Sequence, residues 1–233
     1  DEIYVNHLVC RARKAGWFLE FGNAVPLDAT GLVLGRRVAI LSRLQLADID
    51  LGRSDDPTVQ YLRSTGRWIE RRIPLAAGDK YMVAASIYGV SGAKGTSVKQ
   101  NANNLLFAYA IARTKAAGSA PYIIGADVNF KPQSLASIDQ AIASHELHDI
   151  FHDTFAPTPP PTYSSTGIYE GMSGPGVTRI DTMFVNPGAA PLLSQVGLLY
   201  GQTLSVDHLP LQASFDVQQF DHSIEKLRQP RKM

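Results

Sequence analysis

The chain has 233 residues, of which 45% are hydrophobic and 18% are charged. This length allows one large core and leaves room for only a small second domain. The net charge of +1 excludes an overall field strong enough to mark nucleic acid or a membrane as the partner. Cys10 is the single cysteine, which excludes an internal disulfide framework and CxxC metal sites, and no apolar run approaches the roughly 20 residues that span a bilayer. A reducing, intracellular compartment, nuclear or cytoplasmic, is the favoured location.

The first third of the chain predicts one helix and several strands. Apolar residues recur every three or four positions between residues 3 and 19, which predicts an amphipathic helix there. Three strands are predicted next, at residues 38–41, 68–73 and 81–88. The chain begins at Asp1 without an initiator methionine or a targeting segment, and we expect it to be a segment whose beginning was removed.

The central part predicts a helix, a strand and a second helix. Ser97 opens a capping-box sequence, and apolar residues at helical spacing follow until Gly118, which predicts a helix between them. The apolar run 121–125 predicts a short strand that leads directly into polar residues. A further helix is expected to start near Ser134 and to end around residues 145–147.

The last third predicts a long loop followed by strands. Prolines and glycines are so dense between residues 156 and 176 that a long surface loop is expected there. Strands are predicted at residues 179–185, 195–200 and 209–217. We expect one domain over residues 1–218 and a basic tail or linker over 219–233. Strands predominate and no dinucleotide-binding or P-loop motif occurs, which favours a layered α/β sandwich.

Asp127 and Asn129 follow the strand predicted at 121–125 and lie two positions apart. On an extended backbone, both side chains would project to the same side. In a catalytic interpretation, the Asp127 carboxylate accepts a proton from an attacking water or orients it, and the Asn129 amide donates to a phosphate oxygen. In the alternative, the pair forms an Asx turn that only satisfies backbone groups. The residues alone leave both interpretations open.

Asp207 and His208 repeat this arrangement just before the strand predicted at 209–217. Asp207 offers a hard oxygen ligand of the kind that Mg²⁺ prefers, and His208 offers a donor to charge developing on a phosphoryl group. An exposed turn is the alternative. Asp181 lies within a predicted core strand, where a carboxylate needs a partner, and either Arg179 or an imidazole such as that of His208 would serve.

Five short motifs occur in a particular order along most of the chain. They are Val38-Ala39-Ile40-Leu41-Ser42-Arg43, Ser86-Ile87-Tyr88-Gly89, Ile124-Gly125-Ala126-Asp127-Val128-Asn129, Arg179-Ile180-Asp181 and Val206-Asp207-His208-Leu209-Pro210. In this order they resemble the endonuclease/exonuclease/phosphatase superfamily, which includes apurinic-site nucleases, deoxyribonuclease I-like enzymes, retrotransposon endonucleases and inositol-polyphosphate phosphatases.

The resemblance implies a role for each matched residue. Asp127 and Asn129 match a Gly-Asp-x-Asn element that orients the nucleophilic water and holds the phosphate. Tyr88 matches a tyrosine that contacts the scissile phosphate. His208 matches the histidine that stabilises the transition state, and Asp181 matches the carboxylate paired with this histidine.

The resemblance also implies a divalent cation, Mg²⁺ or Mn²⁺, with Asp207 as a carboxylate close to it. In the family, a strand bearing an asparagine, a helix and a strand ending in Gln-Glu precede the matched region, and that glutamate is the main metal ligand. Glu2 is the candidate for it in this chain. An acid at the first turn of a helix also complements the helix dipole, so a structural role for Glu2 stays open.

The fold implied by the resemblance is an α/β four-layer sandwich in which helices flank two facing mixed β-sheets, with the first strands absent and the site at one edge. The implied activity is Mg²⁺-dependent hydrolysis of phosphodiester bonds in nucleic acid, DNA in particular. Ser91 stands where an asparagine often follows the tyrosine, which weakens an abasic-repair interpretation. Two alternatives stay open: a phosphatase acting on inositol phosphates or phospholipids, and a truncated, non-catalytic domain that binds nucleic acid.

Two further clusters allow other binding functions. One has the spacing of a transition-metal site, although a polar surface at a helix end is the favoured interpretation: His145, His148 and His152 with Asp149 and Asp153. The other could follow a phosphate backbone or form a solvated strand face around one core side chain: Arg63, Arg67, Arg71 and Arg72 with Trp68.

Overall fold

A five-stranded mixed β-sheet forms the centre of the computed structural model, which describes residues 2–23, 37–49, 56–75, 80–92, 97–165, 176–200 and 207–218. The strand order is β3-β4-β5-β9-β6. The strands are β3 (Trp68–Pro74), β4 (Tyr81–Tyr88), β5 (Tyr122–Asp127), β9 (Asp181–Val185) and β6 (His148–Asp149). β4 and β5 run parallel, and the other neighbouring pairs are antiparallel.

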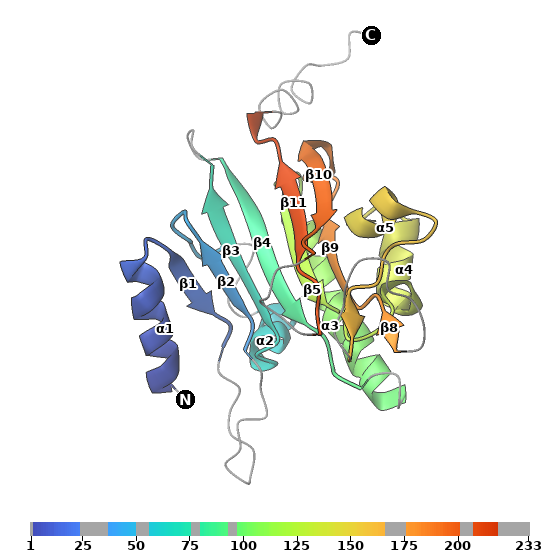
Figure 1. The fold of residues 1–233 in the computed structure, drawn as a ribbon, viewed down its shortest axis with the longest axis horizontal. Helices are drawn as coiled ribbons and strands as arrows, with labels where there is room; N and C mark the ends of the chain where they lie inside the picture. Colours follow the sequence, from blue (N-terminus) through green and yellow to red (C-terminus); the bar gives the residue numbers. More distant parts are fainter. Residues whose placement is uncertain are drawn as a thin grey trace.

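Three helices cover one face of this sheet (Figure 1): α2 (Pro57–Ser64), α3 (Ser97–Ala116) and α4 (Ala136–Ala143). α3 joins β4 to β5, because two parallel strands need a crossover connection. Every second side chain of β5 points into the main core, where it meets the apolar face of α3. Full burial of a side chain such as Phe107 contributes about 1.5–3 kcal/mol, so this layer supplies much of the stability of the fold.

Two two-stranded sheets lie over the opposite face (Figure 1). β1 (Phe18–Phe21) pairs with β2 (Ala39–Ser42) beside β3 and β4, and β10 (Leu193–Leu198) pairs with β11 (Leu211–Phe215), which contacts β9. α1 (Glu2–Lys14) packs beside β1, and α5 (Ile150–Phe155) contacts β9 and β10. Two short 3₁₀ turns, Pro132–Ser134 and Ala190–Leu192, precede α4 and β10. The predicted α/β sandwich of facing sheets flanked by helices is confirmed.

The helix predicted over residues 3–19 is wrong at its end, because α1 stops before Gly16 and a strand begins after it. Gly16 has a φ of 76°, a left-handed conformation that glycine adopts at no steric cost. Its amide donates to the Arg13 carbonyl at 3.0 Å, and the Trp17 amide donates to the Ala12 carbonyl at 2.9 Å. These two bonds form a Schellman C-cap. The last apolar position of the helical pattern therefore belongs to β1.

The helices predicted from Ser97 and from near Ser134 are confirmed, as are the strands that became β2 to β5 and β9 to β11. The sequence did not predict α2, although it has a clear N-cap: the Asp56 side chain accepts from the Thr58 amide at 2.8 Å. The buried positions of α2 are only Val59 and Leu62, too few to establish a helical period in the sequence. α5 was missed for the same reason.

The predicted loop at 156–176 contains one short strand, β7 (Tyr163–Ser164), which pairs with β8 (Val177–Thr178). Residues 166–175 lie outside the described part of the chain, as do the basic tail at 219–233 and the side chain of Glu2. Among the helices that the structure describes, none has the length and apolarity needed to cross a membrane.

A buried ionic network ties α3 to the sheet. Glu70 of β3 and Arg113 of α3 are 5% and 3% exposed, and Nε and Nη2 of the arginine lie 3.1 and 2.7 Å from one carboxylate oxygen. The Tyr122 hydroxyl donates to the other oxygen. Burial, reinforced by the adjacent Glu70 carboxylate, raises the pKa of Tyr122, so its hydroxyl stays a donor. The buried carboxylate is thereby paired and hydrogen-bonded, as a desolvated charge requires.

Candidate active site

Asp127, Asp181 and His208 meet at one edge of the central sheet. Asp127 is the last residue of β5 and Asp181 is the first of β9, and the register pairs them directly across the two strands. His208 lies in the segment that leads into β11. Each residue offers one ligand atom, and these atoms lie within 4.8 Å of one another. Three of the predicted site residues thus form a single cluster.

The backbone around His208 is held by the segment before β7. The Leu209 amide donates to the Thr162 carbonyl at 2.8 Å. The Thr162 hydroxyl, in a residue only 1% exposed, accepts from the amides of Ile180 and Asp181 at 3.1 and 2.9 Å. Thr162 therefore joins the histidine segment to the first residue of β9. These hydrogen bonds fix the separation between His208 and Asp181.

His208 donates from Nδ1 to the carboxylate of Asp181, at 2.9 Å from Oδ2 and 3.2 Å from Oδ1. The proton stays on Nδ1 in both states of the ring, so Nε2 is the nitrogen that gains or loses a proton. This hydrogen bond raises the pKa of His208, burial opposes the rise, and the negative charges of Asp181, Asp127 and Asp207 add to it. The site therefore favours the charged imidazolium.

Arg179, the other predicted partner of Asp181, is bound to a different carboxylate. Its Nη2 lies 2.8 Å from Oδ2 of Asp149, which is fully buried. The same carboxylate accepts from the Thr182 hydroxyl at 2.6 Å and from the Gln133 amide at 3.2 Å. The imidazole of His208 is thus the partner of Asp181, whereas Arg179 links the segment before β9 to Asp149 of β6.

The predicted Asx turn at Asp127 is confirmed, and it does not keep the side chain away from the cluster. Its Oδ1 accepts from the Asn129 amide at 2.8 Å, which is the Asx turn, while the carboxylate also belongs to the cluster. The strand ends at Asp127 and Asn129 has a φ of 52°, so the extended geometry expected for the pair is wrong. The Asn129 side chain instead donates to the Gly89 carbonyl at 3.1 Å. The amide therefore braces the loop after β4 against the loop after β5.

Gly89 is the point where these two loops touch. Its amide donates to the Asp127 carbonyl at 2.7 Å, and a Cβ at this position would lie 2.3 Å from the Val128 carbonyl oxygen. Asn103 of α3 fixes that same oxygen, because its Nδ2 donates to it at 2.7 Å while its Oδ1 accepts from the Val90 amide at 3.1 Å. The close approach of the two backbones leaves room only for glycine.

Arg67 lies at the start of β3 and clamps the end of β4. Its Nη1 donates to the carbonyls of Gly89 and Tyr88 at 2.7 and 3.3 Å, and its guanidinium lies 5.2 Å from the centre of the Tyr88 ring. The Tyr88 hydroxyl is 2.9 Å from the hydroxyl of Ser91. Arg67 therefore positions Tyr88, the tyrosine predicted to contact the phosphate, by hydrogen bonds to the backbone and by contact with the Tyr88 ring.

A cavity of about 530 Å³ opens at the cluster. Tyr88, Asp127, Asp181 and His208 contribute its polar wall, and Leu209 to Leu211 contribute to its apolar wall. The described residues that line it include no lysine or arginine. The two carboxylates and the imidazole therefore determine the charge of the cavity.

Two predicted residues lie outside this arrangement. Asn129 is not among the described residues that line the cavity, although it holds the loop beside it. Asp207 is exposed, and its side chain is not part of the group of close ligand atoms. Its charge still acts on the site by raising the pKa of His208.

The two other clusters have structural roles. Within the described ranges, Asp127, Asp181 and His208 bring their ligand atoms close together, whereas the three histidines at 145, 148 and 152 form no such group. The predicted polar surface is confirmed for His145, which is exposed. It is wrong for Asp149, which is buried and paired with Arg179. In the arginine cluster, Trp68 is a core side chain, Arg71 pairs with Glu20, and Arg72 lies over the ring of Tyr81.

Several solved structures have a fold similar to that of this chain. An AP endonuclease from Archaeoglobus fulgidus matches 90% of this chain and 83% of its own, with 20% identity and a TM-score of 0.62. A 3′ phosphatase from Neisseria bound to a product DNA hairpin matches 89% and 82%, with 18% identity and a TM-score of 0.60. An endonuclease/exonuclease/phosphatase family protein from Bacteroides thetaiotaomicron matches 89% and 78%, with 14% identity and a TM-score of 0.57.

The chain therefore has the fold of the endonuclease/exonuclease/phosphatase superfamily, and the resemblance carried by the five sequence motifs is confirmed at the level of the fold. No protein-family model matches the sequence, and no curated protein matches it significantly.

Thr162, Asn103 and Arg67 support the cluster but were not assigned to it from the sequence. Thr162 and Asn103 act through hydrogen bonds to backbone groups of distant segments, which no local pattern announces. Gly89 did carry a signal, because it closes the motif that begins at Ser86. A glycine directly after a strand often marks a close backbone approach.

Proposed function

We propose that this protein is a metal-dependent phosphodiesterase that cuts nucleic acid, with DNA as the preferred substrate. One observation carries the proposal: two carboxylates and a histidine, on three separate segments, converge at the edge of a sheet and line an open cavity. The two carboxylates repel each other unless a cation or a proton offsets their charge, and groups of this kind gather at functional sites.

The donor set fits a divalent cation. Asp127 and Asp181 offer hard carboxylate oxygens, which suit Mg²⁺ and Mn²⁺, and an imidazole is also a ligand for Mn²⁺. We propose that Asp127 holds the ion and that Asp207, next to His208, reaches it from the rim. Asp181 already binds His208 and so contributes mainly through that residue. When bound, the ion would supply positive charge to the phosphate oxygens and lower the pKa of a bound water.

The residues of the chain would then have distinct roles. Asp127 orients the attacking water, and the imidazolium of His208 donates a hydrogen bond to the phosphoryl oxygens as negative charge develops on them. Asp181 positions the ring and stabilises its charged form. Tyr88 lines the same cavity and offers its hydroxyl to the phosphate, and Asn129 keeps the loop of Asp127 in place.

Two observations support nucleic acid over a clustered-phosphate substrate. A structure similar to this chain is described as bound to a product DNA hairpin. In addition, the described lining of the active-site cavity lacks lysine and arginine, whereas an inositol polyphosphate would need several cations there. A DNA strand needs only one phosphate at the cluster and can find its other contacts along the surface.

The test is hydrolysis of supercoiled plasmid, an abasic duplex and an inositol polyphosphate with Mg²⁺, Mn²⁺ or EDTA. We expect nicking of plasmid that requires the metal and that falls at least about a hundredfold in His208→Ala, the scale of a lost general acid or charge-stabilising donor. His7→Ala, an exposed histidine on α1, is the matched control and should keep full activity. Undiminished cleavage by Asp127→Ala would refute the assigned roles, and turnover of the inositol phosphate alone would replace nuclease by phosphatase.

A further inference from the structure

Two of the clustered histidines converge on one carboxylate. His148 lies in β6 and His152 lies in α5, and their Nδ1 atoms are 4.0 and 3.7 Å from the two oxygens of Asp153. These distances are too long for hydrogen bonds. Two imidazoles and a carboxylate therefore approach one another from two elements without binding each other directly.

Asp153 has no lysine or arginine beside it in the described part of the chain. Its ion-pair partners within 4.0 Å are the two histidines. The neighbouring carboxylate of Asp149, by contrast, is already paired with Arg179. With both imidazoles neutral, the group has one net negative charge and two nitrogen lone pairs. A divalent transition metal needs such ligands, because it binds neutral imidazole and ionised carboxylate.

Buried groups hold the backbone that carries these three side chains. The Asp149 carboxylate caps α5 by accepting from the His152 amide at 3.1 Å, and Arg179 holds the same carboxylate in place. Within α5, Ile150 and Phe151 are 2% and 1% exposed. A backbone that is fixed before the ion arrives lowers the entropy cost of binding it.

The side chains themselves are free to close on an ion. Those of His148, His152 and Asp153 are 33%, 44% and 51% exposed. Bonds of 2.0–2.2 Å place the ligand atoms of a tetrahedral zinc about 3.4 Å apart, so each imidazole would approach the carboxylate by only about 0.3–0.6 Å. Among the described residues, only the active-site cluster has all its ligand atoms within 4.8 Å, so the two rings must also turn toward each other by a change of rotamer.

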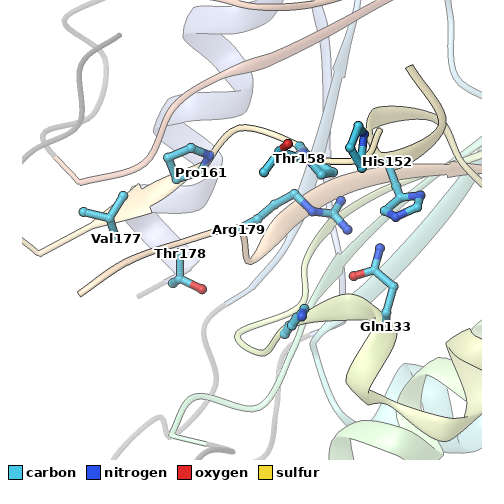
Figure 2. A pocket seen from close by; sticks show the side chains of 10 residues that line it. Gln133, His152, Thr158, Pro161, Val177, Thr178 and Arg179 are labelled. Atoms are coloured by element: carbon cyan, nitrogen blue, oxygen red, sulfur yellow. The ribbon is translucent and has the colours of Figure 1, made fainter. Parts of the chain in front are cut away.

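His152 also lines a cavity of about 640 Å³. Figure 2 shows its ring at one end of this cavity, near the side chains of Gln133 and Arg179. The described lining residues include no carboxylate that would compete for an ion. An ion held by three side chains keeps a fourth position for water, and the cavity gives that water access from the solvent.

We propose that His148, His152 and Asp153 form a metal site separate from the active site, and that it takes a transition-metal dication such as Zn²⁺. Imidazole nitrogens suit Zn²⁺, whereas Mg²⁺ prefers a shell of oxygens. His148 pairs with Val185, four residues along β9 from Asp181, which is a separation of about 13 Å in a strand. A bound ion would tie β6 to α5, whatever the active site does.

The experiment titrates Zn²⁺ into tag-free protein in excess Mg²⁺, followed by calorimetry and by the melting temperature. His148→Ala and His152→Ala each remove one nitrogen ligand, and Asp153→Asn removes the charge. His145→Ala is the matched control, because His145 is exposed and belongs to the same stretch of sequence. His208→Ala removes the imidazole of the active-site cluster and so separates the two sites.

We expect a Zn²⁺ site that persists in His145→Ala and in His208→Ala. Each of the three ligand variants should weaken it at least about tenfold, since loss of even a residue behind a ligand costs that much. At a Zn²⁺ concentration a hundred times the Kd, the melting temperature of the wild type should rise by about 5–10 °C, and this rise should be absent from the ligand variants.

NMR of the histidine rings identifies the ligands directly and does not depend on a variant that folds. The ring signals of His148 and His152 should shift on addition of Zn²⁺, and those of His145 should not. If the signals of His148 and His152 stay in place, the site is refuted. If His208→Ala abolishes all Zn²⁺ binding, the ion occupies the active site alone, which refutes this site and leaves the proposed function intact.

Discussion

Replacement of Gly89 by alanine should damage both the fold and the site. The added Cβ would lie 2.3 Å from the carbonyl oxygen and 2.6 Å from the carbonyl carbon of Val128, and contacts of a real Cβ atom essentially never fall below 3.0 Å. Val128 cannot withdraw easily, because its carbonyl accepts from Asn103 at 2.7 Å and its amide donates to the Ile180 carbonyl at 2.7 Å. The two loops must therefore separate by most of an ångström.

We expect Gly89→Ala to cost about 3 kcal/mol, the upper part of the range for overpacking, because the obstacle is backbone held on both sides. The slope of urea unfolding for a chain of this size is about 3 kcal/mol per molar, so the midpoint should fall by about 1 M. The hydrogen bonds from Gly89 to Asp127 and from Asn129 to Gly89 would stretch as well. Plasmid cleavage should therefore fall more than the folded fraction does.

Urea unfolding followed by tryptophan fluorescence measures this change. Gly197→Ala is the control, because nothing lies within 4 Å of a Cβ at that position in β10 and its φ lies outside the left-handed region. That variant should change stability by less than about 1 kcal/mol, in the stabilising direction if at all. A midpoint for Gly89→Ala within about 0.3 M of the wild type would refute the close-approach reasoning.

Three further predictions concern His208, Thr162 and the buried Glu70–Arg113 pair. In metal-free protein, the pairing of His208 with Asp181 raises the pKa of the histidine, so it stabilises the fold fully below the ordinary histidine pKa and loses this effect as pH rises through the raised value. The melting temperature of His208→Gln should thus lie below that of the wild type at pH 6 and approach it at pH 9. A difference in melting temperature that widens with pH would contradict the direction of the pKa shift. Thr162→Val removes an acceptor of two buried amides and should cost about 1–3 kcal/mol in urea unfolding and lower cleavage, whereas an unchanged midpoint would remove Thr162 from the network. Arg113→Met leaves the Glu70 carboxylate buried without its cation and should cost about 3–5 kcal/mol in urea unfolding. Adding Glu70→Gln should recover part of the loss, and a double variant as unstable as Arg113→Met would contradict the role of the buried charge.

The sequence predicted the elements whose patterns are long or bounded by strong signals. α3 was predicted at its true start because the capping-box sequence at Ser97 and the stop at Gly118 lie at its two ends. The end of α1 was missed because Leu19 continues the helical spacing by chance. The decisive fact, a positive φ at Gly16, depends on backbone geometry that composition does not show.

The site was predictable where a residue acts through its own side chain and not where it supports another. The side chains of Asp127, Asp181 and His208 form the cluster themselves, and the order of the sequence motifs is enough to locate all three. The choice between Arg179 and His208 as the partner of Asp181 depended on Asp149, which is distant in sequence and claims the arginine. The proline-rich stretch was expected to be a surface loop, but part of it also lines a cavity of about 640 Å³ together with Lys131 and β8, which only the fold brings near it.

The direct pairing of Asp127 with Asp181 across β5 and β9 has a consequence for how this protein trades stability for activity. Two carboxylates opposite each other weaken an antiparallel pair, and the imidazolium of His208 offsets only part of their charge, which leaves room for a bound cation to relieve the rest. Any ion that binds there stabilises the folded state by mass action, which makes the melting temperature a direct measure of occupancy. Asp127→Asn keeps an acceptor for the Asn129 amide and relieves the repulsion, so under the proposed function it should give a more stable but inactive protein. Selection for stability alone would therefore remove the site first.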